Sequence, residues 1–96
     1  MVQFKDLDPL LHSQLRLAIV SILMNADAAE FTFIKEQTGA TSGNLSIQIS
    51  KLREAGYIEV EKRFSNNYPQ TLCRITKLGL QKFEEYVNTL GQYIKS

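Results

Sequence analysis

The chain has 96 residues and a net charge of +1, and 44% of its residues are hydrophobic. This length suits one domain with its own apolar core and leaves little room for a second. A single cysteine excludes a disulfide framework or a cysteine-rich zinc cluster, and the absence of a leader or a long apolar run favours a soluble, cytoplasmic protein.

The first element predicted by the sequence is an amphipathic helix over residues 9–25. Asp8 is a good N-cap, and Pro9 suits the first helical position because its missing N–H would be unpaired there. Apolar residues then recur at steps of three and four. They are Leu11, Leu15, Ala18, Ile19, Ile22 and Leu23. His12 has no partners at metal-ligand spacing, so we expect a surface or boundary residue and no metal site.

The next segment reads as a short helix that ends in a glycine turn. Residues 30–31 can add a short strand, and Thr32 is placed to cap a helix that runs to residue 38. Phe33 and Ile34 would form its apolar inner side, together with Gln37 and Thr38. Gly39 permits the left-handed backbone that ends such a helix.

A second helix comes after it over residues 42–55, capped by Thr41 or Ser42 and ended by Gly56. Leu45, Ile49 and Leu52 fall at steps of four and three, so they should pack inward. The side chains expected to point outward or to lie beside that face are Gly43, Asn44, Ile47, Ser50, Lys51 and Glu54, with Gln48 at the edge of the inward face. Ile47 could contact a thymine methyl group or pack against a neighbouring element, and the sequence leaves both open.

A two-stranded ribbon comes next. Residues 57–64 alternate, with Ile58, Val60 and Phe64 on one face. Residues 65–70 form a polar tip, and residues 71–75 form the return strand, with Cys73 and Ile75 inward. Cys73 is therefore expected to be a small buried hydrophobe rather than a reactive thiol.

Thr76 is placed to cap the last helix, which carries a long heptad-like seam. Leu80, Phe83, Val87, Leu90 and Ile94 repeat at alternating steps of three and four, and Tyr86 and Tyr93 widen the seam. This stripe is longer than a small domain needs to cover its own core. We therefore expect residues 77–96 to form a homodimer interface with part of the first helix. The predicted interface residues are Leu7, Leu11, Phe83, Tyr86, Val87, Leu90, Tyr93 and Ile94.

The charge is unevenly distributed. Residues 1–48 carry three basic and five acidic side chains, whereas residues 49–96 carry eight basic and five acidic ones. The positive excess thus falls where the second helix of the pair and the ribbon would lie, which gives modest support for binding to nucleic acid.

The order helix, glycine turn, helix and ribbon is typical of a winged helix-turn-helix, a mainly helical α+β fold with a three-helix core, a two- to three-stranded ribbon and a long C-terminal helix. Five stretches of the chain together resemble the small single-domain regulators of the MarR/ArsR-like superfamily. They are residues 31–35, 43–46, 52–58, 69–71 and 75–79. The likeness covers residues 7–93. It departs from the family at the wing tip, where Asn66 and Asn67 stand in place of the Arg or Lys of many relatives.

The resemblance implies a dimeric regulator, often a repressor, that binds duplex DNA as a single domain over residues 1–96. Its second helix would face the major groove, and the tip over residues 63–70 would approach the minor groove or phosphates. The candidate DNA-binding residues are Ser42, Gly43, Asn44, Ile47, Gln48, Lys51, Lys62, Arg63, Asn66, Asn67 and Arg74. The second helix has no cysteine, so the metal-sensing motif that ArsR members carry there is excluded.

Two other classes of function compete with a DNA-binding regulator. An enzyme is unsupported, because the sequence has no phosphate-binding glycine loop and no paired nucleophile and base. A winged helix used for protein–protein contact is the alternative, because a fold does not determine function and the net charge is low. No cofactor or membrane partner is predicted. A small ligand could lie among the aromatic residues of the last helix, but the sequence names no effector.

Overall fold

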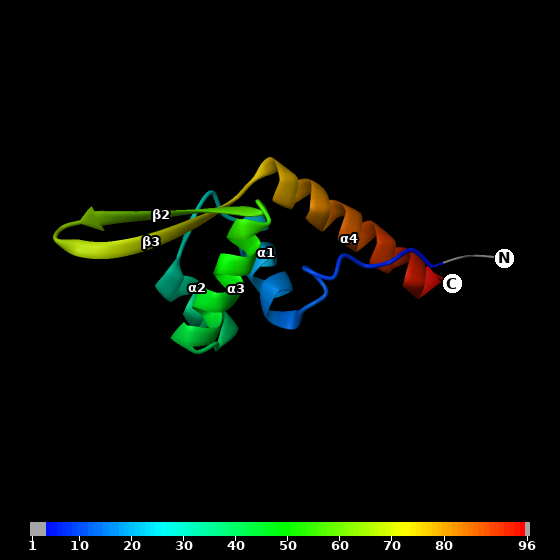
Figure 1. The fold of residues 1–96 in the computed structure, drawn as a ribbon, viewed down its shortest axis with the longest axis horizontal. Helices are drawn as coiled ribbons and strands as arrows, with labels where there is room; N and C mark the ends of the chain where they lie inside the picture. Colours follow the sequence, from blue (N-terminus) through cyan, green and yellow to red (C-terminus); the bar gives the residue numbers. More distant parts are fainter. Residues whose placement is uncertain (1–3, 96) are drawn as a thin grey trace.

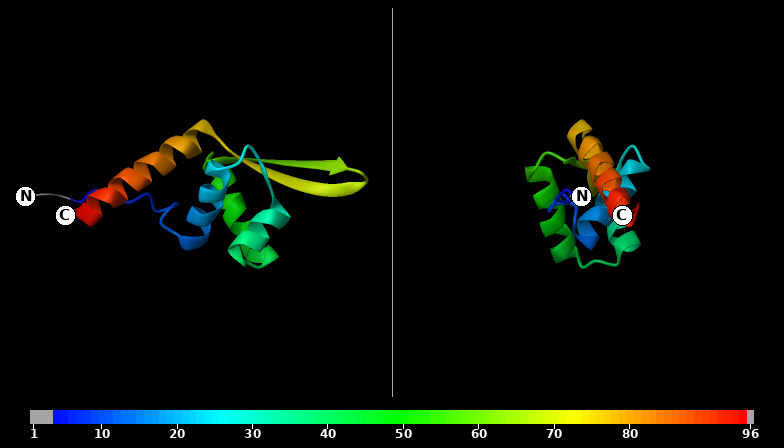
Figure 2. Two further views of the ribbon diagram at one scale, coloured as in Figure 1. Left: turned by 180° about the vertical axis from the view of Figure 1, so that it is seen from behind. Right: turned by 90° about the vertical axis from the view of Figure 1, so that its right-hand side faces the viewer.

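The computed structural model describes residues 4–95. Their elements are α1 (Gln14–Met24), β1 (Ala29–Glu30), α2 (Phe31–Thr38), α3 (Ser42–Glu54), β2 (Ile58–Ser65), β3 (Tyr68–Ile75) and α4 (Lys77–Lys95). Helices α1, α2 and α3 form a compact group, and the β2–β3 ribbon and α4 extend from it in opposite directions (Figures 1 and 2). The molecule is therefore elongated, measuring 60 × 25 × 21 Å. This is the expected mainly helical winged helix arrangement.

The first helix begins later than the sequence predicted. Its N-cap is Ser13, whose hydroxyl accepts a hydrogen bond from the Arg16 amide. Asp8 caps a separate turn instead, because its Oδ1 accepts from the Leu10 amide at 2.9 Å and its carbonyl accepts from the His12 amide at 2.8 Å. This turn directs Leu11 into the core, where it is fully buried. The predicted end of the helix at Asn25 is confirmed.

The start of α2 also differs from the prediction, whereas its end agrees. Glu30 pairs with Leu72 as part of β1, and α2 starts directly after it without a side-chain cap. The Thr32 hydroxyl donates to the Glu30 carboxylate at 3.4 Å, so Thr32 is not the N-cap. Ile34 is buried as expected, but Phe33 is 47% exposed. Gly39 ends the helix with a φ of 71°, the left-handed conformation that was predicted.

The core lies where the three helices meet the base of the sheet. Leu45, Ile49 and Leu52 of α3 are buried, which confirms the inward face of that helix. In α1, Val20 is buried beside Ile19 although it lies outside the predicted face. Because α1 contacts α2, α3 and β3, it is covered on more sides than an amphipathic surface helix. Burying one such aliphatic side chain contributes about 1.5–3 kcal/mol, so this group holds α3 on the scaffold.

The sheet is antiparallel in the order β1-β3-β2. Ser65 pairs with Tyr68 across a two-residue turn in which Asn66 and Asn67 have φ angles of 53° and 59°. Positive φ at both residues is the requirement of a type I′ turn, whose twist matches that of the strands. The ribbon thus stays paired to its tip, and the return strand begins at Tyr68 rather than at Thr71.

The far half of the ribbon extends beyond the core. Phe64 shares a face with Ile58 and Val60, as predicted, but it is 76% exposed because the helices do not reach it. Pro69 is tolerated in β3 because β1 pairs only with Leu72 and Cys73, which leaves that side of the strand open at Pro69. The β2–β3 ribbon therefore projects as an exposed wing.

The junction between the ribbon and α4 is tightly built. Thr76 caps the helix as predicted, because its hydroxyl accepts from the Gly79 amide at 3.0 Å. The same hydroxyl is 2.6 Å from the carbonyl of Gly56 and 3.0 Å from that of Tyr57, and the Thr76 amide also donates to Tyr57 at 3.0 Å. These contacts determine the direction in which α4 leaves the sheet.

The N-terminal segment runs alongside the far end of α4 (Figure 1). The rings of Phe4 and Tyr93 lie 4.8 Å apart, and the Tyr93 hydroxyl donates to the Lys5 carbonyl at 2.6 Å. Nearer the core, His12 Nδ1 lies 3.0 Å from the Tyr86 hydroxyl. The segment therefore covers one side of α4 and leaves another side open.

Candidate nucleic-acid interface

One face of α3 is free of the scaffold and largely polar. Thr41 caps the helix, because its hydroxyl accepts from the Asn44 amide at 3.2 Å. Ile47 is 55% exposed, so the alternative that it packs against a neighbouring element does not hold within this chain. The structure brings the predicted α3 residues together on or beside this face: Ser42, Gly43, Asn44, Ile47 and Lys51 are exposed, and Gln48 is half-buried.

Gln48 and Asn44 are joined in a hydrogen-bonded chain that begins on another helix. The Arg16 guanidinium donates to Gln48 Oε1 at 2.5 Å, and Gln48 Nε2 donates to Asn44 Oδ1 at 3.0 Å. Sequence reasoning missed Arg16. The available signal was a single cation on an otherwise uncharged, mainly apolar helix, a residue type that is rarely placed there without a partner.

A shallow groove of about 440 Å³ separates α3 from the ribbon. Ser46, Ser50 and Arg53 line it from α3, and Val60, Lys62 and Thr71 line it from the strands, with Phe31 and Ile49 also contributing. Within residues 4–95, neither Arg53 nor Lys62 forms an ion pair. Two cations are therefore available beside the exposed face of α3, and Arg53 was not among the predicted DNA-binding residues.

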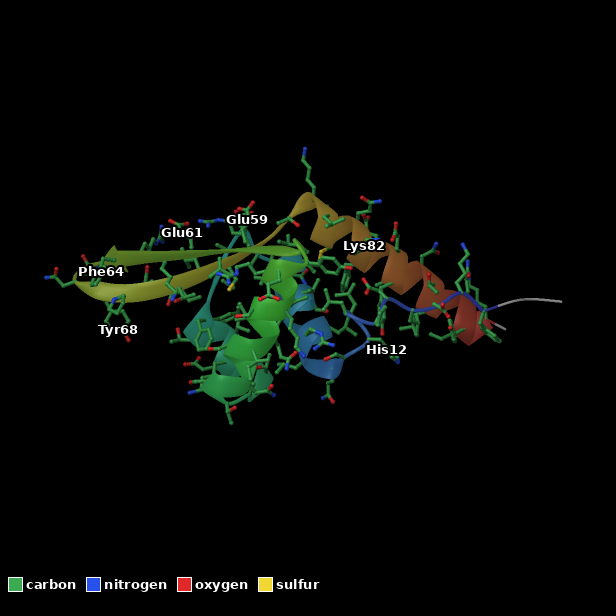
Figure 3. The ribbon with its side chains drawn as sticks, viewed as in Figure 1. His12, Glu59, Glu61, Phe64, Tyr68 and Lys82 are labelled. Atoms are coloured by element: carbon green, nitrogen blue, oxygen red, sulfur yellow. The ribbon has the colours of Figure 1, made fainter. Side chains whose placement is uncertain are left out.

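The other two predicted ribbon cations lie on the opposite face from Lys62. Figure 3 shows Glu59 and Glu61 on the side of the ribbon that faces away from the three-helix group. Arg74 donates to Glu61 at 2.7 Å, and this contact holds the pKa of the Glu61 carboxyl below its usual value. Arg63 donates to Gln70 at 3.4 Å, and Gln70 donates to Glu30 at 2.8 Å. The fold thus separates Lys62 from Arg63 and Arg74 instead of gathering all three on one face.

The wing tip carries exposed aromatic side chains beside its polar turn. Asn66 and Asn67 occupy its turn, and the flanking aromatics Phe64 and Tyr68 are 76% and 63% exposed (Figure 3). Residues that pair across the strands share a face, and Phe64 pairs with Pro69, the neighbour of Tyr68 along β3. Phe64 and Tyr68 therefore lie on opposite faces of the ribbon. The sequence pattern had indicated a loop residue at Tyr68 and an inward-facing residue at Phe64.

The seam of α4 divides into buried and exposed parts. Leu80, Val87 and Ile94 recur every seven residues and are 40%, 50% and 79% exposed. The predicted dimer-interface residues included Val87 and Ile94 but not Leu80. Leu11 and Tyr86 are a correction: they are 0% and 5% exposed within their own chain, so neither has surface to offer to a partner. Leu7, Phe83 and Leu90 are half-buried, and Tyr93 is 37% exposed.

The remaining chemistry within residues 4–95 is limited. No group of three or more His, Cys, Asp or Glu side chains there could hold a metal ion. Cys73 is fully buried, which confirms its predicted place, and burial raises the pKa of its thiol to about 11. Such a thiol stays protonated at neutral pH and is a poor nucleophile. None of the described helices combines the length and apolar character that a bilayer crossing requires.

Comparison with known proteins assigns the fold to a family. The family model described as "Winged helix DNA-binding domain" matches residues 15–94, which include the sheet, α2, α3 and all but one terminal residue each of α1 and α4. The chain belongs to this winged helix family. It is a DNA-binding protein of the transcriptional-regulator type and not an enzyme.

Relatives of this winged helix domain are similar along most of their length. An uncharacterized protein of Methanocaldococcus jannaschii is 31% identical over 85 residues, which cover 88% of this chain and 92% of that protein. The structure of a transcriptional regulator homologue from Pyrococcus horikoshii is similar with a TM-score of 0.84 and 27% identity, covering 90% of this chain and 85% of that one. A zinc-responsive MarR family member of Lactococcus lactis, ZitR, shares the fold with a TM-score of 0.69 and 16% identity, covering 99% and 66% of the two chains.

Proposed function

We propose that this winged helix domain is a sequence-specific, homodimeric repressor that acts on duplex DNA in the cytoplasm. The observation that carries the proposal is the exposed face of α3, which holds polar side chains at its N-terminal end and Lys51 farther along. In helix-turn-helix proteins, the N-terminal part of this helix reaches the base edges. Ser42, Gly43 and Asn44 would then lie closest to the major groove. Ile47 would supply an apolar contact to a thymine methyl group.

The wing would support this contact from the flanking backbone. Lys62 and Arg53 border the groove between α3 and the ribbon, so both can reach phosphates next to the bases that α3 reads. At the tip, Arg63, Asn66 and Asn67 offer polar groups to the neighbouring minor groove. Arg74 has Glu61 as a competing partner, so we expect its contribution to be the weakest among the predicted ribbon residues.

We further propose that residues 77–96 form the dimerisation helix of a single domain that spans residues 1–96. The exposed stripe Leu80, Val87 and Ile94 repeats at the heptad spacing that packs one helix against another. Two-fold pairing would place the two α3 helices in successive major grooves, about 10 base pairs apart. Phe83, Leu90 and Tyr93 would border this contact.

A salt titration on random-sequence duplex DNA tests whether the protein binds DNA at all, which the whole proposal requires. Nonspecific attraction to phosphates releases counterions, so the logarithm of the binding constant should fall linearly with the logarithm of the salt concentration. A protein that uses its winged helix only for protein–protein contact would not bind random duplexes even at low salt. Such a result would remove the DNA-binding proposal.

Replacing Lys51 with alanine should reduce the slope of this salt dependence by about 1. Lys51 is exposed on the proposed DNA-facing side of α3, and removing one phosphate contact releases about one counterion fewer. The change should weaken binding to all sequences alike. Lys77→Ala is the matched control, because Lys77 is exposed at the start of α4 and should leave the slope unchanged. Equal slopes for the Lys51 variant and the wild type would contradict the placement of Lys51.

A further inference from the structure

Arg16 connects the first helix of the winged helix domain to its proposed DNA-reading helix. The side chain is half-buried between α1 and α3, and its Nε donates to the Leu10 carbonyl at 2.6 Å. A second nitrogen donates to Gln48 Oε1, and Gln48 in turn donates to Asn44, four residues earlier on α3. We refer to the chain Arg16–Gln48–Asn44 as the amide relay.

The chemistry of arginine determines the direction of every bond in the amide relay. A guanidinium has only donors, so the group of Gln48 that faces it must be the oxygen. The Gln48 NH₂ group then points to Asn44, and Asn44 must meet it with its own oxygen. In each amide, the oxygen therefore faces the donor that comes before it in the relay.

Arg16 is held firmly in this role. Within residues 4–95 it forms no ion pair, and its guanidinium donates to the Leu10 carbonyl and the Gln48 oxygen. Rotating the Gln48 amide by half a turn would place NH₂ against the guanidinium and leave donors of both groups without acceptors. An unsatisfied, partly buried donor costs more than a normal hydrogen bond gains, so the relay keeps its polarity.

We propose that Arg16 is a positioning residue that fixes the orientation of the Asn44 amide, so that its NH₂ group is the group presented to DNA on the proposed DNA-reading face. The Asn44 oxygen is turned toward Gln48, from which it accepts, and its NH₂ group remains for an external acceptor. In the major groove guanine offers two adjacent acceptors, N7 and O6, whereas adenine offers one acceptor and one donor. The amide relay therefore selects guanine over adenine opposite Asn44. This inference rests on the proposed function, in which α3 reads the major groove.

The proposal revises the pairing that residue types alone indicate. A free asparagine or glutamine pairs with adenine because its amide donates and accepts at once. In this structure the Gln48 oxygen is bound to Arg16 and the Asn44 oxygen is bound to Gln48. Both oxygens are thus turned along the relay, toward Arg16 and Gln48, and the NH₂ group of Asn44 is the group placed to meet a base.

The first test uses the protein without DNA. The side-chain NH₂ resonances of Gln48 and Asn44 can be followed by nuclear magnetic resonance in the wild type and in Arg16→Met. We expect the Gln48 NH₂ protons to exchange slowly in the wild type and to lose that protection in the variant, because the relay no longer has a fixed direction. Equal protection in both proteins would overturn the positioning role of Arg16, whatever the protein does with DNA.

The second test selects bound duplexes from a pool with randomised sequence. The wild type should recover guanine over adenine at the position opposite Asn44 by roughly tenfold or more. Arg16→Glu should reverse the relay, because a carboxylate accepts from the Gln48 NH₂ group and leaves the Asn44 oxygen facing outward. The preference should then move to a base that presents a donor, adenine or cytosine. Lys77→Glu makes the same change of charge at the start of α4 and should recover guanine as the wild type does.

Asn44→Asp provides the same reversal without altering the contact between α1 and α3. Asn44 is exposed, so the variant should fold even if Arg16→Glu does not. Its carboxylate presents an acceptor outward, and the selected base should again change from guanine to adenine or cytosine. A wild type that selects adenine at this position, or an unchanged guanine preference in Asn44→Asp, would overturn the inference. If the wild type does not bind random duplexes at all, the proposed function on which this inference rests would be refuted instead.

Discussion

Replacing Gly79 with alanine is expected to lower the free energy of unfolding by about 3 kcal/mol or more. An alanine Cβ at this position would overlap the carbonyl oxygen of Tyr57 and lie 2.9 Å from the carbonyl carbon. Both are backbone atoms, so no side-chain rotation can relieve the overlap. The same carbonyl accepts from the Thr76 amide, which means that any shift also disturbs the cap of α4. Urea unfolding at fixed protein concentration measures the effect.

The chain contains a matched control for this substitution. Gly43 also lies in a helix, but nothing approaches within 4 Å of the position that its Cβ would take. Alanine at Gly43 should therefore be neutral or stabilise the fold by up to about 1 kcal/mol, because glycine is a poor helix former. Similar unfolding free energies for the Gly79 and Gly43 variants would contradict the close packing of α4 against Tyr57, the residue before β2.

Replacing Val87 with glutamate is expected to convert the proposed dimer to a monomer at concentrations on the order of tens of micromolar. Val87 is 50% exposed at the centre of the stripe that includes Leu80 and Ile94, so a single folded chain tolerates the carboxylate. In the dimer, however, the carboxylate would be buried in an apolar contact without a partner, at a cost of several kcal/mol. Analytical ultracentrifugation of both proteins reports the change directly.

Loss of the dimer should also weaken binding to DNA with two half-sites by about 10²–10⁴-fold, because the second half-site then no longer binds within the same complex. Binding to a single half-site should change little. Asn88→Glu is the matched control, because it adds the same charge on the next residue, which faces the groove beside the N-terminal segment. A wild type that sediments as a monomer, or a Val87→Glu variant that remains dimeric, would contradict the proposed interface.

The local elements of this protein follow closely from short-range chemistry. The steps of four and three between Leu45, Ile49 and Leu52 predicted the buried face of α3, and all three residues are buried. Gly39 and Thr76 were placed correctly because left-handed backbone and helix capping depend on the residue itself and a few neighbours. The buried place of Cys73 followed from strand alternation in the same way.

Errors arose where a distant segment competed with the local signal. Asp8 has the residue type and position of an N-cap, yet its carboxylate accepts a 2.5 Å hydrogen bond from the Tyr57 hydroxyl, 49 residues away, and caps a turn instead of the helix. Desolvation and this contact raise the pKa of Tyr57, so the phenol remains a donor. Phe64 has the alternation of a core residue, but the helices end before they can cover it.

The order of helices, the glycine turn, the buried stripe of α3 and the ribbon were thus determined by the chain itself, because periodicity and capping act over a few residues. The polarity of the proposed DNA-reading face was decided only by the tertiary structure. A helical wheel places Gln48 and Asn44 at or beside the outward side of α3, but it cannot show that Arg16, 32 residues earlier, binds the Gln48 oxygen. That contact exists because α1 packs across α3. It turns the Asn44 oxygen toward Gln48 and leaves the NH₂ group to meet a base, which is the feature on which the proposed choice of base depends.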